Sequence, residues 1–226
     1  MNRIKGKISE IFESIQGEGI YLGEKQIFVR LFGCNLSCGF CDTRPDSFTE
    51  YDPHELLEEI KLYRKNSHCV SFTGGEPLLQ KDFLKDVLRL THKAGFKNYL
   101  ETNGTLSEEL EEVIHDVHIV AMDLKLPSST GLNGFWEEHH KFLKVASRKE
   151  VFLKAIICET TDEDDLKEGL RLIKEVDRSA VLILQPNSNE RQVKLIEKLK
   201  TFKALCKKEK VTAFIIPQLH KIMGLK

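Results

Sequence analysis

The sequence predicts an α/β fold, organised as one domain over residues 1–226 around about six parallel strands. Short apolar segments alternate with longer helical ones, which is typical of parallel strands joined by right-handed crossovers. The polar motifs fall just after strands, and a parallel sheet gathers its chemistry at the carboxyl ends of its strands. About six units are too few for a full barrel, so an incomplete β/α barrel and an open doubly wound sheet both remain.

The predicted strands are short, apolar and often β-branched, and turn or helix signals bound each of them. They are Gln26–Phe32, Cys69–Thr73, Asn98–Thr102, His118–Leu124, Val151–Ile157, Ala180–Gln185 and Val211–Ile216.

Helical stretches lie between these strands, and local residues mark where several of them begin or end. Pro53 suits a first helical position with Asp52 as its cap, and Gly95 stands where a glycine ends a helix. In the last stretch, residues such as Val193 and Ile196 recur at helical spacing and are expected to face the core. The predicted helices are Pro53–Lys65, Asp82–Ala94, Ser107–His115, Phe135–Arg148, Glu163–Val176 and Glu190–Lys208.

Composition and charge narrow the class of protein. The formal net charge is -1, so the basic excess of a nucleic-acid binder is missing. The N-terminal residues carry charges every few positions and lack the apolar core of a signal peptide. No apolar run approaches the roughly 20 residues that span a bilayer. We therefore expect a cytoplasmic protein with no membrane or nucleic-acid partner.

Three of the six cysteines, Cys34, Cys38 and Cys41, form a C-x3-C-x2-C cluster directly after the first predicted strand. Thiolates are soft ligands that suit zinc or iron–sulfur centres. Three of them can hold three corners of a [4Fe–4S] cluster, and the missing fourth leaves one iron open. The alternative is a zinc-stabilised binding module, but its fourth ligand would have to come from residues without finger-like spacing.

This cluster, with the aromatic Phe40 before its last cysteine, resembles the radical S-adenosylmethionine superfamily. The resemblance implies a partial β/α barrel and an open iron that binds the amino and carboxylate groups of S-adenosylmethionine. It implies that reductive cleavage then yields a 5′-deoxyadenosyl radical, with the protein positioning the cofactor. No catalytic side chain is assigned.

Motifs at four further strand ends fit the same resemblance. The Gly-Gly-Glu-Pro run at residues 74–77 ends the second predicted strand, and glycine permits close approach to a ligand. Each of these motifs, the Gly-Gly-Glu-Pro run included, could instead be ordinary turn chemistry. The resemblance implies that S-adenosylmethionine contacts Gly75, Thr102, Asp123, Leu124, Lys125 and Gln185.

Segments near both ends resemble the 7-carboxy-7-deazaguanine synthase family. They are Ser14–Gly19, Phe28–Leu31, Cys41–Thr43 and Pro217–Lys221. The resemblance implies that 6-carboxy-5,6,7,8-tetrahydropterin is bound by Ile15, Gln16, Gly17, Arg30, Thr73 and the terminal Lys226, and that Thr43 binds Mg²⁺. A guanidinium suits the pterin carboxylate, and Mg²⁺ takes hard oxygen ligands.

The reaction that this resemblance implies is a radical ring contraction to 7-carboxy-7-deazaguanine with loss of ammonia, on the route to 7-deazapurines such as queuosine. It also implies a homodimer and an electron donor such as flavodoxin or ferredoxin. The rival reading is a glycyl-radical-activating enzyme, which shares the cysteine spacing and the Gly-Gly-Glu-Pro loop but acts on a protein partner.

Overall fold

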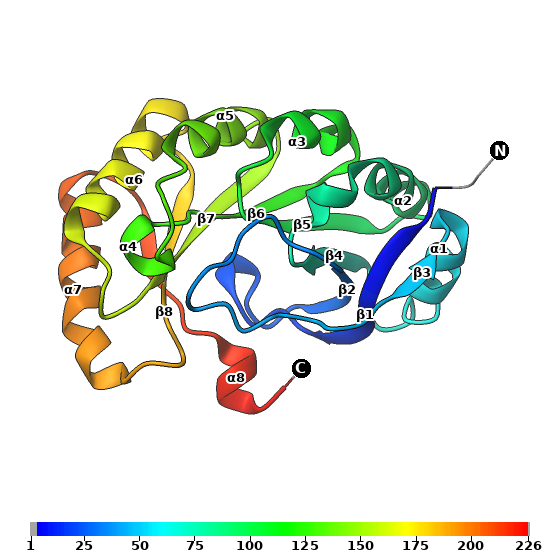
Figure 1. The fold of residues 1–226 in the computed structure, drawn as a ribbon, viewed down its shortest axis with the longest axis horizontal. Helices are drawn as coiled ribbons and strands as arrows, with labels where there is room; N and C mark the ends of the chain where they lie inside the picture. The colour runs from blue at the N-terminus through cyan, green and yellow to red at the C-terminus, as the bar shows by residue number, and fades with distance from the viewer. Residues whose placement is uncertain (1–3, 226) are drawn as a thin grey trace.

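The computed structural model describes residues 4–225, and within them one curved nine-stranded sheet carries the fold (Figure 1). The strand order is β3-β1-β2-β4-β5-β6-β7-β8-β9. From β2 to β9 neighbouring strands pair in parallel, whereas β1 pairs antiparallel with both β2 and β3. The strands are β1 Gly6–Ile15, β2 Lys25–Leu31, β3 Thr49–Tyr51, β4 Cys69–Gly74, β5 Lys97–Thr102, β6 Ile119–Asp123, β7 Glu150–Ile157, β8 Val181–Pro186 and β9 Ala213–Ile215.

Most of the helices lie along the outer side of the curved sheet, as Figure 1 shows for α2, α3, α5 and α6, whereas the short α4 and α8 lie apart from that row. They are α1 Pro53–Lys61, α2 Lys81–Lys93, α3 Ser107–Val113, α4 Pro127–Thr130, α5 Trp136–Ala146, α6 Glu163–Val176, α7 Gln192–Lys208 and α8 Leu219–Met223. Short 3₁₀ turns cover Gly19–Tyr21, Pro77–Gln80 and Ile114–Asp116.

The order of the parallel strands decides between the two predicted architectures. From β2 to β9 the chain always moves to the next strand in one direction. Because crossovers are right-handed, such an order puts every crossover helix on the same face of the sheet. A doubly wound sheet would instead reverse direction and place helices on both faces. The incomplete β/α barrel is therefore confirmed.

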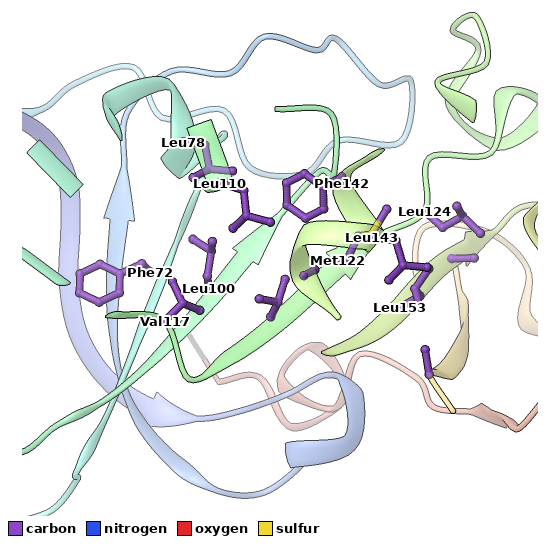
Figure 2. Packing of buried hydrophobic residues seen from close by; sticks show 14 of the residues in the cluster. Phe72, Leu78, Leu100, Leu110, Val117, Met122, Leu124, Phe142, Leu143 and Leu153 are labelled. Carbon is purple, nitrogen blue, oxygen red and sulfur yellow. The ribbon is translucent and has the colours of Figure 1, made fainter. Parts of the chain in front are cut away.

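The two faces of the sheet contact different parts of the protein, because side chains alternate along each strand. Outward residues such as Val29, Phe72 and Leu153 join the core beneath the helices, part of which Figure 2 shows. On the inner face, Tyr99 and Phe152 belong to a second apolar cluster near the amino ends of the strands. Many inner positions nearer the carboxyl ends, such as Thr73, Glu101 and Lys154, are polar, and they line a cavity at that end.

Helix boundaries confirm the local signals. Asp52 accepts hydrogen bonds from the backbone N–H groups of His54 and Glu55 at 2.9 and 3.1 Å, and the Glu55 carboxylate accepts one from the Asp52 N–H at 2.9 Å. This capping box starts α1 at Pro53. Gly95 follows α2 with a φ of 83°, a left-handed conformation that glycine adopts without strain.

The structure differs from the sequence prediction at several elements, of which α7 and β1 are the longest. The prediction that Val193 and Ile196 face the core is wrong, because they are 81% and 46% exposed while Leu195 and Leu199 are buried. Leu199 and Phe202, which belong to the same periodic set, are buried as predicted, so the error is confined to the first turns of α7. Strand β1 was also not predicted, because a register shift between Ile8 and Glu10 interrupts its alternation.

No helix within residues 4–225 combines the length and the apolar character that crossing a membrane requires.

Candidate functional site

A cavity of about 240 Å³ lies at the carboxyl ends of the parallel strands. It brings together most of the residues that the sequence predicted for the site. Those that line it are Ile15, Gln16, Gly17, Arg30, Cys34, Cys38, Cys41, Thr43, Thr73, Gly75, Thr102, Asp123, Lys125 and Gln185.

The cysteine loop follows β2 and forms one wall of this cavity. Cys38 is buried, whereas Cys34 and Cys41 are exposed, and none of the three is in a disulfide. The Gly39 N–H donates to the Thr130 carbonyl at 2.9 Å, which fastens the loop to α4. Among the described residues, no three His, Cys, Asp or Glu side chains form a group placed to hold a metal ion.

The donor set of this loop fits an iron–sulfur cluster. Three unpaired thiols from one short loop share a single cavity, which matches the ligand chemistry of a cluster that leaves one iron open. Lys125 lies 5.6 Å from the centre of the Phe40 ring, beside the same loop. A cation there offsets part of the negative charge that thiolates bring.

The two glycines of the Gly-Gly-Glu-Pro loop let this loop pack closely against another backbone segment of the protein. Gly74 has a φ of 136°, and a Cβ on it would collide with the backbone of Leu31. A Cβ on Gly75 would collide with the backbone of Gly33, next to Cys34. Close approach was predicted toward a ligand, but the structure shows that it packs this loop against the start of the cysteine loop.

Glu76 ties this loop to the one after β5. Its side chain is 0% exposed and accepts hydrogen bonds from the Leu78 N–H at 3.1 Å, the Asn103 N–H at 2.7 Å and the Thr102 hydroxyl at 2.9 Å. Burial raises the pKa of Glu76 to about 7, although these donors oppose the shift. Asn103 extends the connection, because its amide donates to the Asn35 side chain at 2.8 Å. The two strand-end loops thus hold the cysteine loop from one side.

Four alternating charges cross the cavity floor. Lys154 lies 2.6 Å from Glu18 and 3.4 Å from Asp123, and Asp123 lies 2.8 Å from Lys125. Burial alone would raise the pKa of Glu18 and of Asp123, but the neighbouring ammonium groups leave both below their usual values. Burial would likewise lower the pKa of Lys154, but the carboxylates hold it well above its usual value. The row is therefore ionised and close to neutral overall.

A second polar group surrounds Glu101 on the inner face. Its carboxylate accepts hydrogen bonds from the Gln16 amide at 2.9 Å, the Thr73 hydroxyl at 3.1 Å and the Ser71 hydroxyl at 3.4 Å. Gln16 also accepts from the Glu18 N–H at 3.1 Å. These bonds fix the orientation of Gln16 and Thr73 at the cavity wall.

An aromatic pair and an arginine form the neighbouring wall. Phe12 and Phe28 stack with ring centres 5.2 Å apart and planes 11° apart. Arg30 lies 5.8 Å from the centre of the Phe12 ring, and its Nε lies 3.5 Å from Glu10. Its side chain is 21% exposed, so the guanidinium remains accessible from the cavity.

The C-terminal segment reaches the cavity. The Leu219 N–H donates to the Gly17 carbonyl at 2.8 Å, Gln218 donates to Glu18 at 2.8 Å, and Lys221 forms an ion pair with Asp42. His220 packs so closely on Gly17 that a Cβ there would collide with its ring. Lys226, a predicted substrate contact, lies outside the described residues.

Thr43 stands between the cysteine loop and this segment. Its hydroxyl donates to the Asp42 carboxylate at 3.1 Å. Burial would raise the pKa of Asp42, but Lys221 outweighs that effect and lowers it. Thr43 and Asp42 therefore bring a hydroxyl and an ionised carboxylate to the same edge of the cavity.

Two predicted cofactor contacts have contrasting surroundings. Gln185 is 0% exposed and lines the cavity, and neither atom of its amide has a hydrogen-bond partner among the described residues. A buried amide without partners is costly unless a ligand or water meets it. Leu124 lies in the apolar core (Figure 2), and its backbone N–H and carbonyl bond to Lys154 and Leu126. The structure therefore does not bring Leu124 to the cavity.

Sequence reasoning gave no role to Lys154, and it named Glu18, Glu101 and Gln218 only as members of motifs, with no role of their own. Lys154 was the most detectable, because it is a lone charge in the middle of a predicted apolar strand. In the structure it pairs in register with Asp123 of β6. A charged residue on an inner strand face indicates that polar groups line the inside of the sheet. Only the strand register shows which charged residue pairs with it.

Known proteins resemble this chain over most of its length. Residues 29–199 match the family described as the Radical SAM superfamily. The chain is 31% identical to a 7-carboxy-7-deazaguanine synthase of Geobacter sulfurreducens, covering 99% of both chains. It is 33% identical to one of Archaeoglobus fulgidus, covering 99% of this chain and 100% of that one. The crystal structure of QueE from Escherichia coli has the same fold, with a TM-score of 0.65, 21% identity and 92% of each chain covered.

Proposed function

This chain belongs to the Radical SAM superfamily and, within it, to the 7-carboxy-7-deazaguanine synthases, and on that premise we propose how its cavity performs their reaction. The reaction contracts the ring of 6-carboxy-5,6,7,8-tetrahydropterin to 7-carboxy-7-deazaguanine, and one ammonia leaves for each product. The observation that carries the proposal is that one cavity joins the three cysteines to the segments at 15–17 and 218–221.

Membership of the superfamily implies a [4Fe–4S] cluster and S-adenosylmethionine. When bound, these two supply the radical that starts the rearrangement. Cys34, Cys38 and Cys41 hold the cluster at the wall formed by their loop. The hydrogen bond from Gly39 to α4 and the packing of Gly75 against Gly33 keep that loop in place.

The S-adenosylmethionine side of the cavity lies at the ends of β4, β5, β6 and β8. Gly75, Thr102, Asp123, Lys125 and Gln185 form this side. The unpartnered amide of Gln185 supports the assignment, because a polar group of the ligand would satisfy it. The charges of Asp123 and Lys125 suit the amino and carboxylate groups of an amino acid.

The pterin side lies at the ends of β1 and β2. Ile15, Gln16 and Gly17 border the ring, and Thr73 contacts it from β4. Arg30 binds the substrate carboxylate, and the partner it already has, Glu10 at 3.5 Å, aligns its guanidinium. The stacked Phe12 and Phe28 give this side an apolar wall for a flat ring.

Thr43 binds Mg²⁺ beside the substrate carboxylate. Mg²⁺ prefers oxygen ligands and keeps several waters, so a hydroxyl next to the ionised Asp42 suits it. The ion pair of Asp42 with Lys221 then links the Mg²⁺ side of the cavity to the C-terminal segment. Lys226 is a further substrate contact under this proposal.

The wider setting follows from the same assignment. Residues 1–226 act as one radical SAM domain, in a homodimer, and take electrons from flavodoxin or ferredoxin. The six cysteines are unpaired, which suits the reducing cytoplasm.

Incubation with the pterin, dithionite and S-adenosylmethionine tests the proposal. Release of ammonia from the pterin is expected. A radical formed on a partner protein, with no ammonia, would instead identify a glycyl-radical-activating enzyme, which the near full-length likeness to the synthases does not favour.

A further inference from the structure

Lys154 is a buried cation in the cavity floor that the proposed function does not use. It lies on β7 opposite Asp123 in the strand register, and its side chain is 5% exposed. Below it on the same strand face, Phe152 belongs to the inner apolar cluster. Lys154 therefore lies at the boundary between the inner apolar cluster and the cavity.

Its two partners come from opposite sides of the site. Glu18 directly follows Gln16 and Gly17 on the pterin side, and its Oε2 lies 2.6 Å from the ammonium group. Asp123 belongs to the S-adenosylmethionine side, and its Oδ1 lies 3.4 Å from the same group. Gln218 fixes the other oxygen of Glu18 at 2.8 Å, and Lys125 fixes the other oxygen of Asp123 at 2.8 Å.

A shared cation makes the two carboxylates depend on each other. An ammonium group this buried is stable only beside anions, and each buried carboxylate is costly without a cation. If Glu18 moves away, Lys154 loses its nearer partner and Asp123 gains a larger share of its charge. A change in the position of Glu18 on one side of the cavity therefore changes how strongly Lys154 pairs with Asp123 on the other side.

Resting on the two-ligand site proposed above, we propose that Lys154 is a positioning residue that couples the two halves of the site. A ligand that draws Glu18 away as its own partner leaves Lys154 to Asp123, and so prepares Asp123 and Lys125 for the second ligand. The cost of separating Glu18 from Lys154 then falls on the first ligand alone, which makes binding cooperative. Linkage requires the effect to have the same size in both directions.

Anaerobic calorimetry on the cluster-loaded enzyme, without reductant so that no turnover occurs, tests this coupling. The dissociation constant of S-adenosylmethionine is measured with and without saturating 6-carboxy-5,6,7,8-tetrahydropterin, and the reverse titration is also made. In the wild type each ligand should tighten the other about fivefold or more, by equal factors. In Lys154→Met this factor should fall to nearly one.

Two further variants separate coupling from misfolding. Glu18→Gln/Lys154→Met removes both members of the closest ion pair, so it leaves less unpaired charge and should fold while still lacking the coupling. Lys198→Met removes a lysine that bonds the Thr161 carbonyl at 2.8 Å, outside the cavity lining, and should keep the wild-type factor.

The outcomes are distinct. A wild-type factor of one, or an unchanged factor in either Lys154 variant while both ligands bind, overturns the coupling and leaves the proposed function standing. Failure of the wild type to bind the pterin at all refutes the proposed function, and the coupling falls with it.

Discussion

Glu76 gives the sharpest stability prediction, because its buried carboxyl holds two loops of the site together. Its pKa in the folded protein is about 7, against 4.5 for an ordinary glutamate. Between these values the folded protein keeps a proton that the unfolded chain has released. The stabilisation is therefore fully present below pH 4.5 and is lost as the pH rises through 7. At 1.36 kcal/mol per pH unit the total is about 3 kcal/mol, of which about 2.5 kcal/mol falls between pH 5 and 8.

The substitution Glu76→Gln removes this titration. Urea unfolding of wild type and variant from pH 5 to 8 should show their difference in unfolding free energy, wild type minus variant, falling by about 2.5 kcal/mol. A constant offset is expected as well, because the amide N–H₂ faces the N–H of Leu78 or of Asn103. Glu76→Asp, which keeps a titrating carboxyl, should retain the wild-type slope. Parallel curves for wild type and Glu76→Gln, within about 0.5 kcal/mol, would refute the reasoning.

Four predictions concern the site itself. The wild type should be brown with about four irons per chain, and Cys38→Ala should lose the cluster by iron analysis and absorbance; a colourless zinc-loaded wild type would contradict this. Thr43→Ala should weaken Mg²⁺ activation in the ammonia assay while the iron content is kept, so an unchanged Mg²⁺ titration counts against the role. Arg30→Lys should raise the Michaelis constant of the pterin about tenfold, because lysine lacks the planar guanidinium that donates two hydrogen bonds to a carboxylate. An equal rise with an analogue lacking the carboxylate would indicate misfolding. A chain stopped after Lys221 and one extended at its C-terminus should both turn over more slowly, and wild-type kinetics in both would mean that the tail does not close the site.

Strand and helix order could be predicted because apolar periodicity and caps are local signals. The strand predicted at Val151–Ile157 is observed at Glu150–Ile157, and the helix at Glu163–Val176 has the predicted bounds. Strand β3 was missed because three residues give no periodicity, and α8 because its residues read as a tail. The error at Val193 arose because apolar residues lie on two faces of α7, and only packing decides which face is buried.

Site residues could be predicted where a motif ends a strand, because the carboxyl ends of parallel strands converge. Gly75, Thr102 and Gln185, which the resemblance assigned to the cofactor, line the cavity for this reason. Their partners could not be predicted, because they depend on register and tertiary contact. The contact of Lys154 with Glu18 spans 136 positions, and that of Glu18 with Gln218 spans 200. Strand alternation alone would have placed Leu124 on the face opposite Asp123, and the structure buries it in the core there.

The most direct test of the central claim is to measure product and ammonia in one anaerobic reaction. Cluster-loaded enzyme, dithionite, Mg²⁺ and a small amount of S-adenosylmethionine act on excess 6-carboxy-5,6,7,8-tetrahydropterin, and mass spectrometry follows the product. We predict equal amounts of 7-carboxy-7-deazaguanine and ammonia, in excess over the S-adenosylmethionine supplied because the cofactor is regenerated. Cleavage of S-adenosylmethionine by an enzyme with a full cluster, with the pterin left unchanged, would contradict the account.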